Sequence, residues 1–309
     1  MEEQLWFACS DGKVEDVLNL LQNPQINTNW QDSQYSRTAF WIACYLGHIE
    51  IVKLLLNDQR VDINKGNGLD ATPFYIACEN KVVEVVKLLL NDKRVDVNKS
   101  LNSGETPLYI ACWNGHTEIV KLLLQDKRID LNKVNSNGAT PFYIACQEGH
   151  IEIVKLLLND KRVDVNKTLN RGHSPIYISC QNGRIEVVKL LLNDKRVDIN
   201  KANNNGATPL FTACQEGNIE IVKYLLVSGR EIDIKAKNNN GKTALEISKE
   251  RSSGLKFGNE TDSEYQRAKK NCPKIVALIE SFQKNQSETR EKLRKELGKF
   301  LISYFCYIY

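Results

Sequence analysis

The sequence lacks long hydrophobic runs, a surplus of one charge sign and an apolar segment near its start. No stretch reaches the ~18–20 consecutive apolar residues of a membrane helix, so we predict no transmembrane segment. The opening residues MEEQ are acidic and no apolar run follows them, which predicts no secretory signal. A net charge of only +4 over 309 residues argues against a strongly basic nucleic-acid-binding domain. With 42% hydrophobic residues, the chain is expected to fold.

The dominant feature of the sequence is an internal repeat with a period of 34 residues. The box TPFYIAC at residues 72–78 returns as TPLYIAC at 106–112 and as TPFYIAC at 140–146. A second block, IEIVKLLL at 49–56 in its first copy, follows each of the first six boxes, and a third block, VDIN at 61–64, follows the second. Such a unit is too small to bury a core alone, so neighbouring units are expected to stack. Variants of the box begin at Thr38, Ser174, Thr208 and Thr243.

Each block predicts a local structure. The threonine of the box caps a helix, and the proline fits its first turn, where a missing N–H is tolerated. In the second block, Ile49, Val52, Leu55 and Leu56 are predicted on one face of a second helix. Glycine ends the first helix in a left-handed conformation at positions 47, 115, 149, 183 and 217. Lys81 replaces this glycine, and because a left-handed non-glycine residue costs about 1 kcal/mol or more, we expect irregular structure there.

These blocks resemble the ankyrin repeat, whose pattern is T-P-L-H-x-A, then G-H-x-E-I-V-x-L-L, then D-V-N. The resemblance covers about residues 1–283, and the W-x-x-L-G-x-x-Y signature of tetratricopeptide repeats is missing. It implies an all-α ankyrin-repeat solenoid of helix-turn-helix-hairpin units with a C-terminal helical tail. In this family, partner proteins usually bind the concave surface formed by hairpin tips and first helices.

One departure from the family pattern concerns the histidine of the box. By resemblance this position points into the core between repeats, so we expect packing rather than a platform for stacked bases. The hydrogen bond that the histidine makes is then lost or replaced. The residues at this position are Trp41, Tyr75, Tyr109, Tyr143, Tyr177, Phe211 and Glu246.

The repeat boundaries divide the chain into a repeat region and a tail. We expect a degenerate capping repeat at 1–35 and a final repeat at 241–283 that is interrupted by a loop insertion near 251–272. Residues 284–309 predict a basic helical tail with a stop at Gly298 and an apolar end. The apolar end 300–309 packs on the last repeat, frays and aggregates, or contacts a partner or membrane surface. The six complete repeats are expected at 36–69, 70–103, 104–137, 138–171, 172–205 and 206–240.

Nine cysteines do not predict disulfides or a metal site. Seven of them recur at one position of the first helix, and adjacent helices pack about 8–10 Å apart. A disulfide needs Cα atoms within about 7 Å, and zinc needs sulfur atoms at about 2.3 Å. We therefore expect buried packing residues, and many reduced thiols predict a cytoplasmic or, alternatively, a nuclear protein. The seven are Cys9, Cys44, Cys78, Cys112, Cys146, Cys180 and Cys214.

The histidines predict no catalytic site. His48, His116 and His150 share one repeat position, so the repeat carries them along the chain rather than together, and His173 lies at a predicted loop tip. No P-loop, nucleophile elbow or H-E-x-x-H pair occurs. We therefore predict no enzyme activity, no cofactor, no metal and no small-molecule substrate.

Repeated basic residues leave a second function open. The pair Lys93-Arg94 recurs every 34 residues, and a lysine follows each VDIN-like block in the complete repeats up to residue 201. Stacking aligns them into stripes, which suit phosphate-bearing ligands such as nucleic acid or an anionic membrane surface, together with the basic tail. An aspartate stands beside each pair, so compensated solvated faces are the favoured interpretation, and electrostatic binding is the alternative.

Positions that vary between similar repeats are the candidates for partner contact. Aromatic side chains dominate interface hot spots, which draws attention to Tyr45 and Trp113. Neutral variation at exposed sites is the competing explanation for each position. The predicted partner-binding residues are Tyr45, Leu46, Glu79, Asn80, Trp113, Asn114, Gln147, Glu148, Gln181, Asn182, Gln215, Glu216, Arg171 and His173. The sequence thus predicts a monomeric, non-catalytic scaffold or adaptor that binds one or more proteins, whose identity the repeat does not encode.

Overall fold

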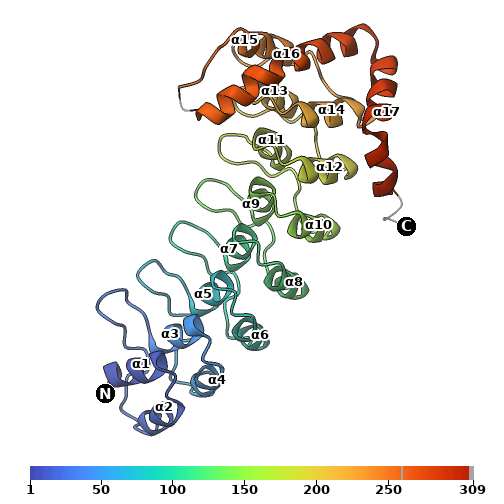
Figure 1. The fold of residues 1–309 in the computed structure, drawn as a ribbon. Helices are drawn as coiled ribbons and strands as arrows, with labels where there is room; N and C mark the ends of the chain where they lie inside the picture. Colours follow the sequence, from blue (N-terminus) through green and yellow to red (C-terminus); the bar gives the residue numbers. More distant parts are fainter. Residues whose placement is uncertain (259, 306–309) are drawn as a thin grey trace. The chain divides into compact units, whose positions relative to one another are not determined.

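The computed structural model describes residues 1–258 and 260–305, and within these residues it contains 17 α-helices and no strand. The expected all-α repeat solenoid is therefore confirmed (Figure 1). By its internal contacts the chain divides into two compact units. The first comprises Met1–Ala145 and Asn159–Val163, and the second comprises Cys146–Leu158 and the chain from Asp164.

The first unit consists of stacked helix pairs. In each pair a first helix packs against a second helix, and equivalent helices of successive pairs lie side by side (Figure 1). A loop precedes each first helix from α3 onward. The helices are α1 (Glu2–Ser10), α2 (Val14–Leu21), α3 (Ala39–Leu46), α4 (Ile49–Asn57), α5 (Pro73–Glu79), α6 (Val83–Asn91), α7 (Pro107–Trp113) and α8 (Thr117–Gln125), and α9 (Pro141–Glu148) is divided between the units.

The second unit continues the pairs and ends in two longer helices. First helices α11, α13 and α15 lie side by side, as do second helices α12 and α14. The long helix α16 packs against α13, α14 and α15, and α17 packs against α14 and α16. The bounds are α10 (Ile151–Asn159), α11 (Pro175–Gln181), α12 (Ile185–Asn193), α13 (Pro209–Gln215), α14 (Ile219–Val227), α15 (Ala244–Ser252), α16 (Asp262–Lys284) and α17 (Gln286–Phe305).

The box begins each first helix in the predicted way. Thr38 Oγ1 accepts a hydrogen bond from the Trp41 N–H at 3.0 Å, which satisfies one of the free amides at the helix start. Gly47 ends the same helix at φ 75°, in the left-handed region. Equivalent caps occur at Thr72, Thr106, Thr140, Ser174, Thr208 and Thr243.

The irregularity expected at Lys81 was wrong. Lys81 adopts the left-handed conformation at φ 60°, and the Val82 N–H donates to the Ala77 carbonyl at 2.9 Å. The equivalent bond in the next repeat, from the His116 N–H to the Ala111 carbonyl, has the same length. The packing of the repeat thus imposes the glycine conformation on a lysine.

The column of box aromatics forms part of the core, as expected. Trp41, Tyr75, Tyr109, Tyr143, Tyr177 and Phe211 are all buried. The hydrogen bond of the family histidine is replaced, because Trp41 Nε1 donates to the Ala71 carbonyl at 2.9 Å in the next loop. Tyr177 OH likewise accepts from Asn203 Nδ2 at 3.2 Å. The seven repeated cysteines are buried and free, as predicted.

The buried face of the second helix differs by one position from the prediction. In α4, Ile51, Val52 and Leu55 are fully buried, whereas Ile49 and Leu56 are partly exposed. Ile51 and Val52 precede Leu55 by four and three residues, so the three side chains share one helical face.

The loop expected over 251–272 is shorter than predicted. Helix α15 reaches Ser252, and α16 begins at Asp262, so only residues 253–261 connect them. A capping box explains the start of α16, since Thr261 Oγ1 accepts from the Glu264 N–H and Glu264 Oε2 accepts from the Thr261 N–H at 2.8 Å. Pro273 lies inside this helix rather than near its start.

The tail is helical, but Gly298 does not end it. Helix α17 continues through Gly298 to Phe305. Leu293 and Leu297 are buried, and Arg290 Nε donates to the Leu226 carbonyl of α14 at 3.1 Å. These contacts outweigh the roughly 1 kcal/mol that an interior glycine costs a helix. The alternatives for residues 300–309 concern side chains that lie outside the described part of the chain.

A buried ion pair holds the connection between α15 and α16. The Arg251 side chain is 1% exposed, and its guanidinium contacts the Glu260 carboxylate at 2.6 Å. It also donates to the Leu255 carbonyl at 2.6 Å and to the Gln215 carbonyl at 3.0 Å. The Phe257 ring lies 5.0 Å from the guanidinium carbon. One side chain thus fixes the path of the connecting segment against α13.

Replacing Lys81 by glycine is expected to stabilise the protein by about 0.5–1 kcal/mol. The change removes about 1–2 kcal/mol of left-handed strain, partly offset by the greater freedom of glycine in the unfolded chain. Urea unfolding followed by circular dichroism should show a higher midpoint at unchanged slope. Lys93→Gly, at a lysine without positive φ, is the matched control and should show no gain. An unchanged or lower midpoint for Lys81→Gly would contradict the explanation.

Replacing Glu260 by alanine is expected to destabilise the protein by about 3 kcal/mol, because it leaves the buried Arg251 guanidinium without its counter-ion. Hydrogen exchange should rise over the connecting segment and over the start of α16. Glu280→Gln, which breaks the exposed pair with Lys249, should shift stability by less than about 1 kcal/mol. Equal effects of the two substitutions would show that the buried pair is dispensable.

Acidification should reproduce this loss in the unchanged protein. The hydrogen bond from Arg251 lowers the pKa of Glu260 below its ordinary value of 4.5. The carboxylate therefore stabilises the fold fully above pH 4.5, and this contribution disappears as the pH falls toward the lowered pKa. The Glu260→Ala variant should lack that part of the pH dependence.

Candidate functional site

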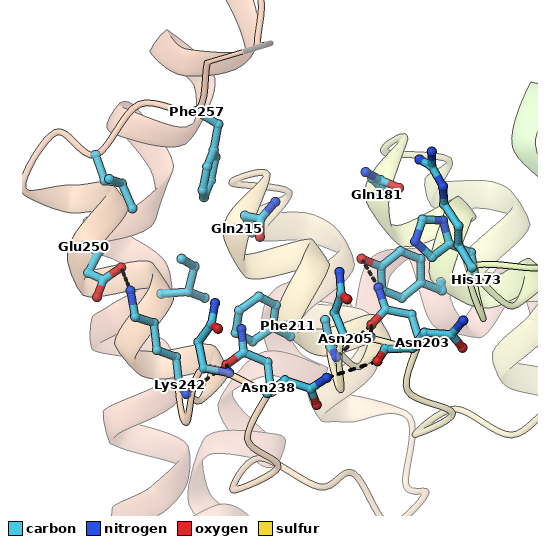
Figure 2. Close-up of a pocket in the computed structure, with 18 of the residues that line it drawn as sticks. His173, Gln181, Asn203, Asn205, Phe211, Gln215, Asn238, Lys242, Glu250 and Phe257 are labelled. Carbon is cyan, nitrogen blue, oxygen red and sulfur yellow. Dashed lines mark hydrogen bonds and ion pairs between the residues drawn. The ribbon is translucent and has the colours of Figure 1, made fainter.

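The second unit carries a groove beside its first helices α11, α13 and α15 (Figure 2). The groove has a volume of about 810 Å³. Tyr177, Phe211 and Ile247, one from each of these helices, line it together with the hairpin tips of three repeats. Leu255 and Phe257, from the segment after α15, complete the lining. Its shape therefore depends on the buried ion pair that fixes this segment.

Asparagine side chains build the hairpins that border the groove. Asn203 Oδ1 accepts from the backbone N–H groups of Asn205 and Ala207 at 3.0 and 2.9 Å, which closes the turn. Asn238 does the same in the next repeat. Asn204 Nδ2 and Asn239 Nδ2 each donate to a carbonyl of the preceding hairpin. These four carboxamides hold the tips in position.

Other carboxamides of the groove have no such structural role. The side chains of Gln181, Asn205 and Asn240 make no hydrogen bond within the described residues, and Asn205 and Asn240 are exposed. Gln215 donates from Nε2 to Glu216 Oε1 at 3.0 Å, and its own Oε1 faces no hydrogen-bond donor in the part of the chain that is described. The groove therefore presents amide donors and acceptors from successive repeats.

The charges of the groove are largely compensated. Lys242 Nζ pairs with Glu250 Oε2 at 2.7 Å (Figure 2). The His173 ring stacks on Tyr177 at 4.5 Å, and its pKa is lowered by burial and by the nearby Arg171 charge, which keeps it neutral at pH 7. Arg171 itself is exposed and has no ion pair among the described residues. One uncompensated positive charge thus remains, at the α11 end.

Four of the predicted partner-binding residues meet in this groove, namely Arg171, His173, Gln181 and Gln215. Glu216 instead lies under α16, where its carbonyl accepts from Arg267 Nε at 3.0 Å and burial raises the pKa of its carboxyl group. The other predicted residues of this unit, Gln147, Glu148 and Asn182, do not line the groove.

In the first unit the predicted residues divide into exposed and structural ones. Tyr45, Leu46 and Trp113 are 40%, 44% and 47% exposed. Tyr45 stacks on the buried Trp41 at 5.4 Å, so part of its ring is held in place. The carboxamides of Asn80 and Asn114 donate to backbone carbonyls, those of Ile76 and Glu79. Burial raises the pKa of the Glu79 carboxyl group.

Sequence reasoning missed several groove residues. Asn240 and Lys242 occupy the tip of the last hairpin, and the repeat period offered a signal for them. Leu255 and Phe257 belong to the insertion, which has no counterpart in the other repeats. No periodic signal predicts their place, because it depends on the Arg251 contacts.

The repeated arginines serve the scaffold. Arg94 Nη2 contacts Asp92 Oδ2 at 2.6 Å and donates to the Leu56 carbonyl at the end of the preceding second helix at 2.7 Å. A cation at a helix C-terminus satisfies free carbonyls and complements the helix dipole. The bond recurs from Arg60, Arg128, Arg162 and Arg196. Their guanidinium groups are therefore engaged by the protein itself.

The lysine that follows each VDIN-like block is also used in several repeats. Lys99, Lys133 and Lys201 each donate to an asparagine carbonyl of the preceding repeat. Among the residues described, no group of three histidine, cysteine or acidic side chains is placed to hold a metal ion. Over the same residues, no helix has both the length and the apolar character that crossing a bilayer requires.

Comparisons with known proteins agree with this architecture. The family model "Ankyrin repeats (3 copies)" matches residues 5–100, 59–135, 85–169, 127–203 and 195–254. Among solved structures, the chain is similar to the crystal structure of the ankyrin repeat domain of Bcl-3, which is described as a unique member of the IkappaB protein family. The identity is 25% and the TM-score 0.63, over 68% of this chain and 93% of that chain. A comparison with curated proteins gives no match. Since the family model matches well over half of its residues, the chain belongs to the ankyrin-repeat family.

Proposed function

We propose that this protein is a non-catalytic scaffold or adaptor that binds partner proteins on the face formed by its hairpin tips and first helices. Ankyrin repeats in general mediate protein–protein interaction and are typically not enzymes. The proposal rests mainly on one observation: many of the constant polar side chains of the repeats are engaged within the scaffold, whereas varied ones are available on this face.

The division of roles is visible in both units. The box threonines cap helices and the repeated arginines close preceding helices. By contrast, Tyr45, Trp113 and Gln181 vary from repeat to repeat and are at least partly exposed on first helices. Partly exposed aromatic residues on a fixed backbone are suited to interface anchors, because little side-chain freedom is lost on binding.

The electrostatic alternative has less support. Phosphate binding through the stripes requires free cations, and the arginines already pair with aspartate and helix carbonyls. The lysines beside them, such as Lys127 and Lys195, are exposed and remain available. We also propose a monomer in the cytoplasm or nucleus, and the eight free, buried cysteines of the described chain support a reducing compartment.

Site-specific photo-crosslinking tests the proposed face. A benzoylphenylalanine at Gln181 or at Trp113 should label partner proteins in cell extract, because both side chains lie on first helices. The same probe at Lys195 or at Lys127, each exposed and on the loop after a second helix of the corresponding unit, is the matched control and should label several-fold less. The labelling should persist when salt is raised.

Two results would contradict the proposal. Equal labelling from the control positions would mean that partners do not use this face. Labelling that comes from the lysine positions and disappears with salt would favour the electrostatic alternative.

A further inference from the structure

We infer that the groove of the second unit binds an extended peptide segment through its backbone, with an acidic side chain of the peptide at Arg171 and an apolar one at Leu255 and Phe257. The inference rests on the proposed function and adds the kind of partner that this groove recognises. It is carried by the spacing, the chemistry and the charge of the lining residues.

The spacing of the lining residues fits an extended chain. Helices of neighbouring repeats pack about 8–10 Å apart, and an extended strand advances about 3.3 Å per residue. Three repeats therefore span about 20 Å, the length of about six extended residues. Gln181 and Gln215 occupy equivalent places on α11 and α13, and Asn205 and Asn240 lie on successive tips.

The chemistry of these side chains fits a peptide backbone. Each carboxamide offers donors and an acceptor, and each peptide unit offers one donor and one acceptor. The carboxamides of Gln181, Asn205 and Asn240 make no hydrogen bond within the described residues. Neighbouring side chains such as Asn204 tie the hairpins together, so the tips are held in place before binding. Little order remains to be imposed when the peptide binds.

The charge of the groove gives the peptide an orientation-specific feature. Lys242 is neutralised by Glu250, and His173 is neutral at pH 7, so the positive charge of Arg171 is the uncompensated one in the described lining. A carboxylate of the peptide complements it. At the other end, Leu255 is exposed and Phe257 is packed over Arg251, which offers an apolar contact. The two features lie about three repeats apart.

A positional-scanning library of nonapeptides, blocked at both termini, tests the inference on the full chain. Aspartate or glutamate should be enriched at one position, and apolar residues should be enriched about five to seven positions away. Arg171→Gln should abolish the acidic preference and weaken the selected peptide about tenfold, as expected for one charged hydrogen bond. Lys195→Gln removes the same charge outside the groove and should leave both unchanged.

Backbone recognition is tested by methylating the central peptide nitrogens of the selected sequence. Binding should weaken at least about tenfold, since the amide donors are lost. Methylated peptides that bind as tightly as their parent would overturn the inference, as would selected peptides whose acidic preference is absent or survives Arg171→Gln. A library that yields no binder would also overturn it. Crosslinks from Gln181 to a folded partner would in that case still uphold the proposed function.

Discussion

The structure depends on the fact that each repeat completes the helix ends and the core of its neighbour. Arg94 illustrates this, because its guanidinium is fixed by Asp92 and satisfies the Leu56 carbonyl of the repeat before it. Trp41 does the same in the opposite direction along the chain, through the Ala71 carbonyl of the following loop. A unit of 34 residues has too little interior to be stable alone, so these bonds between repeats are what makes the fold possible.

The same constraint separates scaffold from surface. Side chains that bond to a neighbouring repeat must recur with the period, and they are spent on stability. Side chains on the tips and at the ends of first helices carry no such duty, and these are the positions that differ between repeats. In the second unit, this freedom produces a groove of carboxamides with one uncompensated cation at Arg171. In the first unit, it leaves Tyr45 and Trp113 partly exposed on otherwise buried helices.

Periodic features could be predicted from the sequence, and features that occur once could not. The threonine caps, the glycine helix ends and the buried aromatic column follow from residues that recur with a local physical role. At Lys81 a local penalty was overridden by packing, and at Gly298 a helix stop was overridden by contacts with α14. The position of Leu255 and Phe257 depends on tertiary bonds of Arg251, which no pattern of neighbours in the chain reveals. For that reason four groove residues were predicted and the wall after α15 was missed.

The bond from Arg290 to the Leu226 carbonyl has a consequence for how such a chain can grow. In the complete repeats, the arginine of the following repeat occupies the equivalent carbonyl, as Arg196 does for Leu158. At the last second helix, α17 supplies that arginine from outside the repeat pattern. A repeat duplicated after residue 240 would have to displace the tail, whereas a repeat duplicated between existing ones would find both neighbours already matched. Changes in repeat number during evolution are thus directed to the interior of the gene, where the middle repeats are most alike.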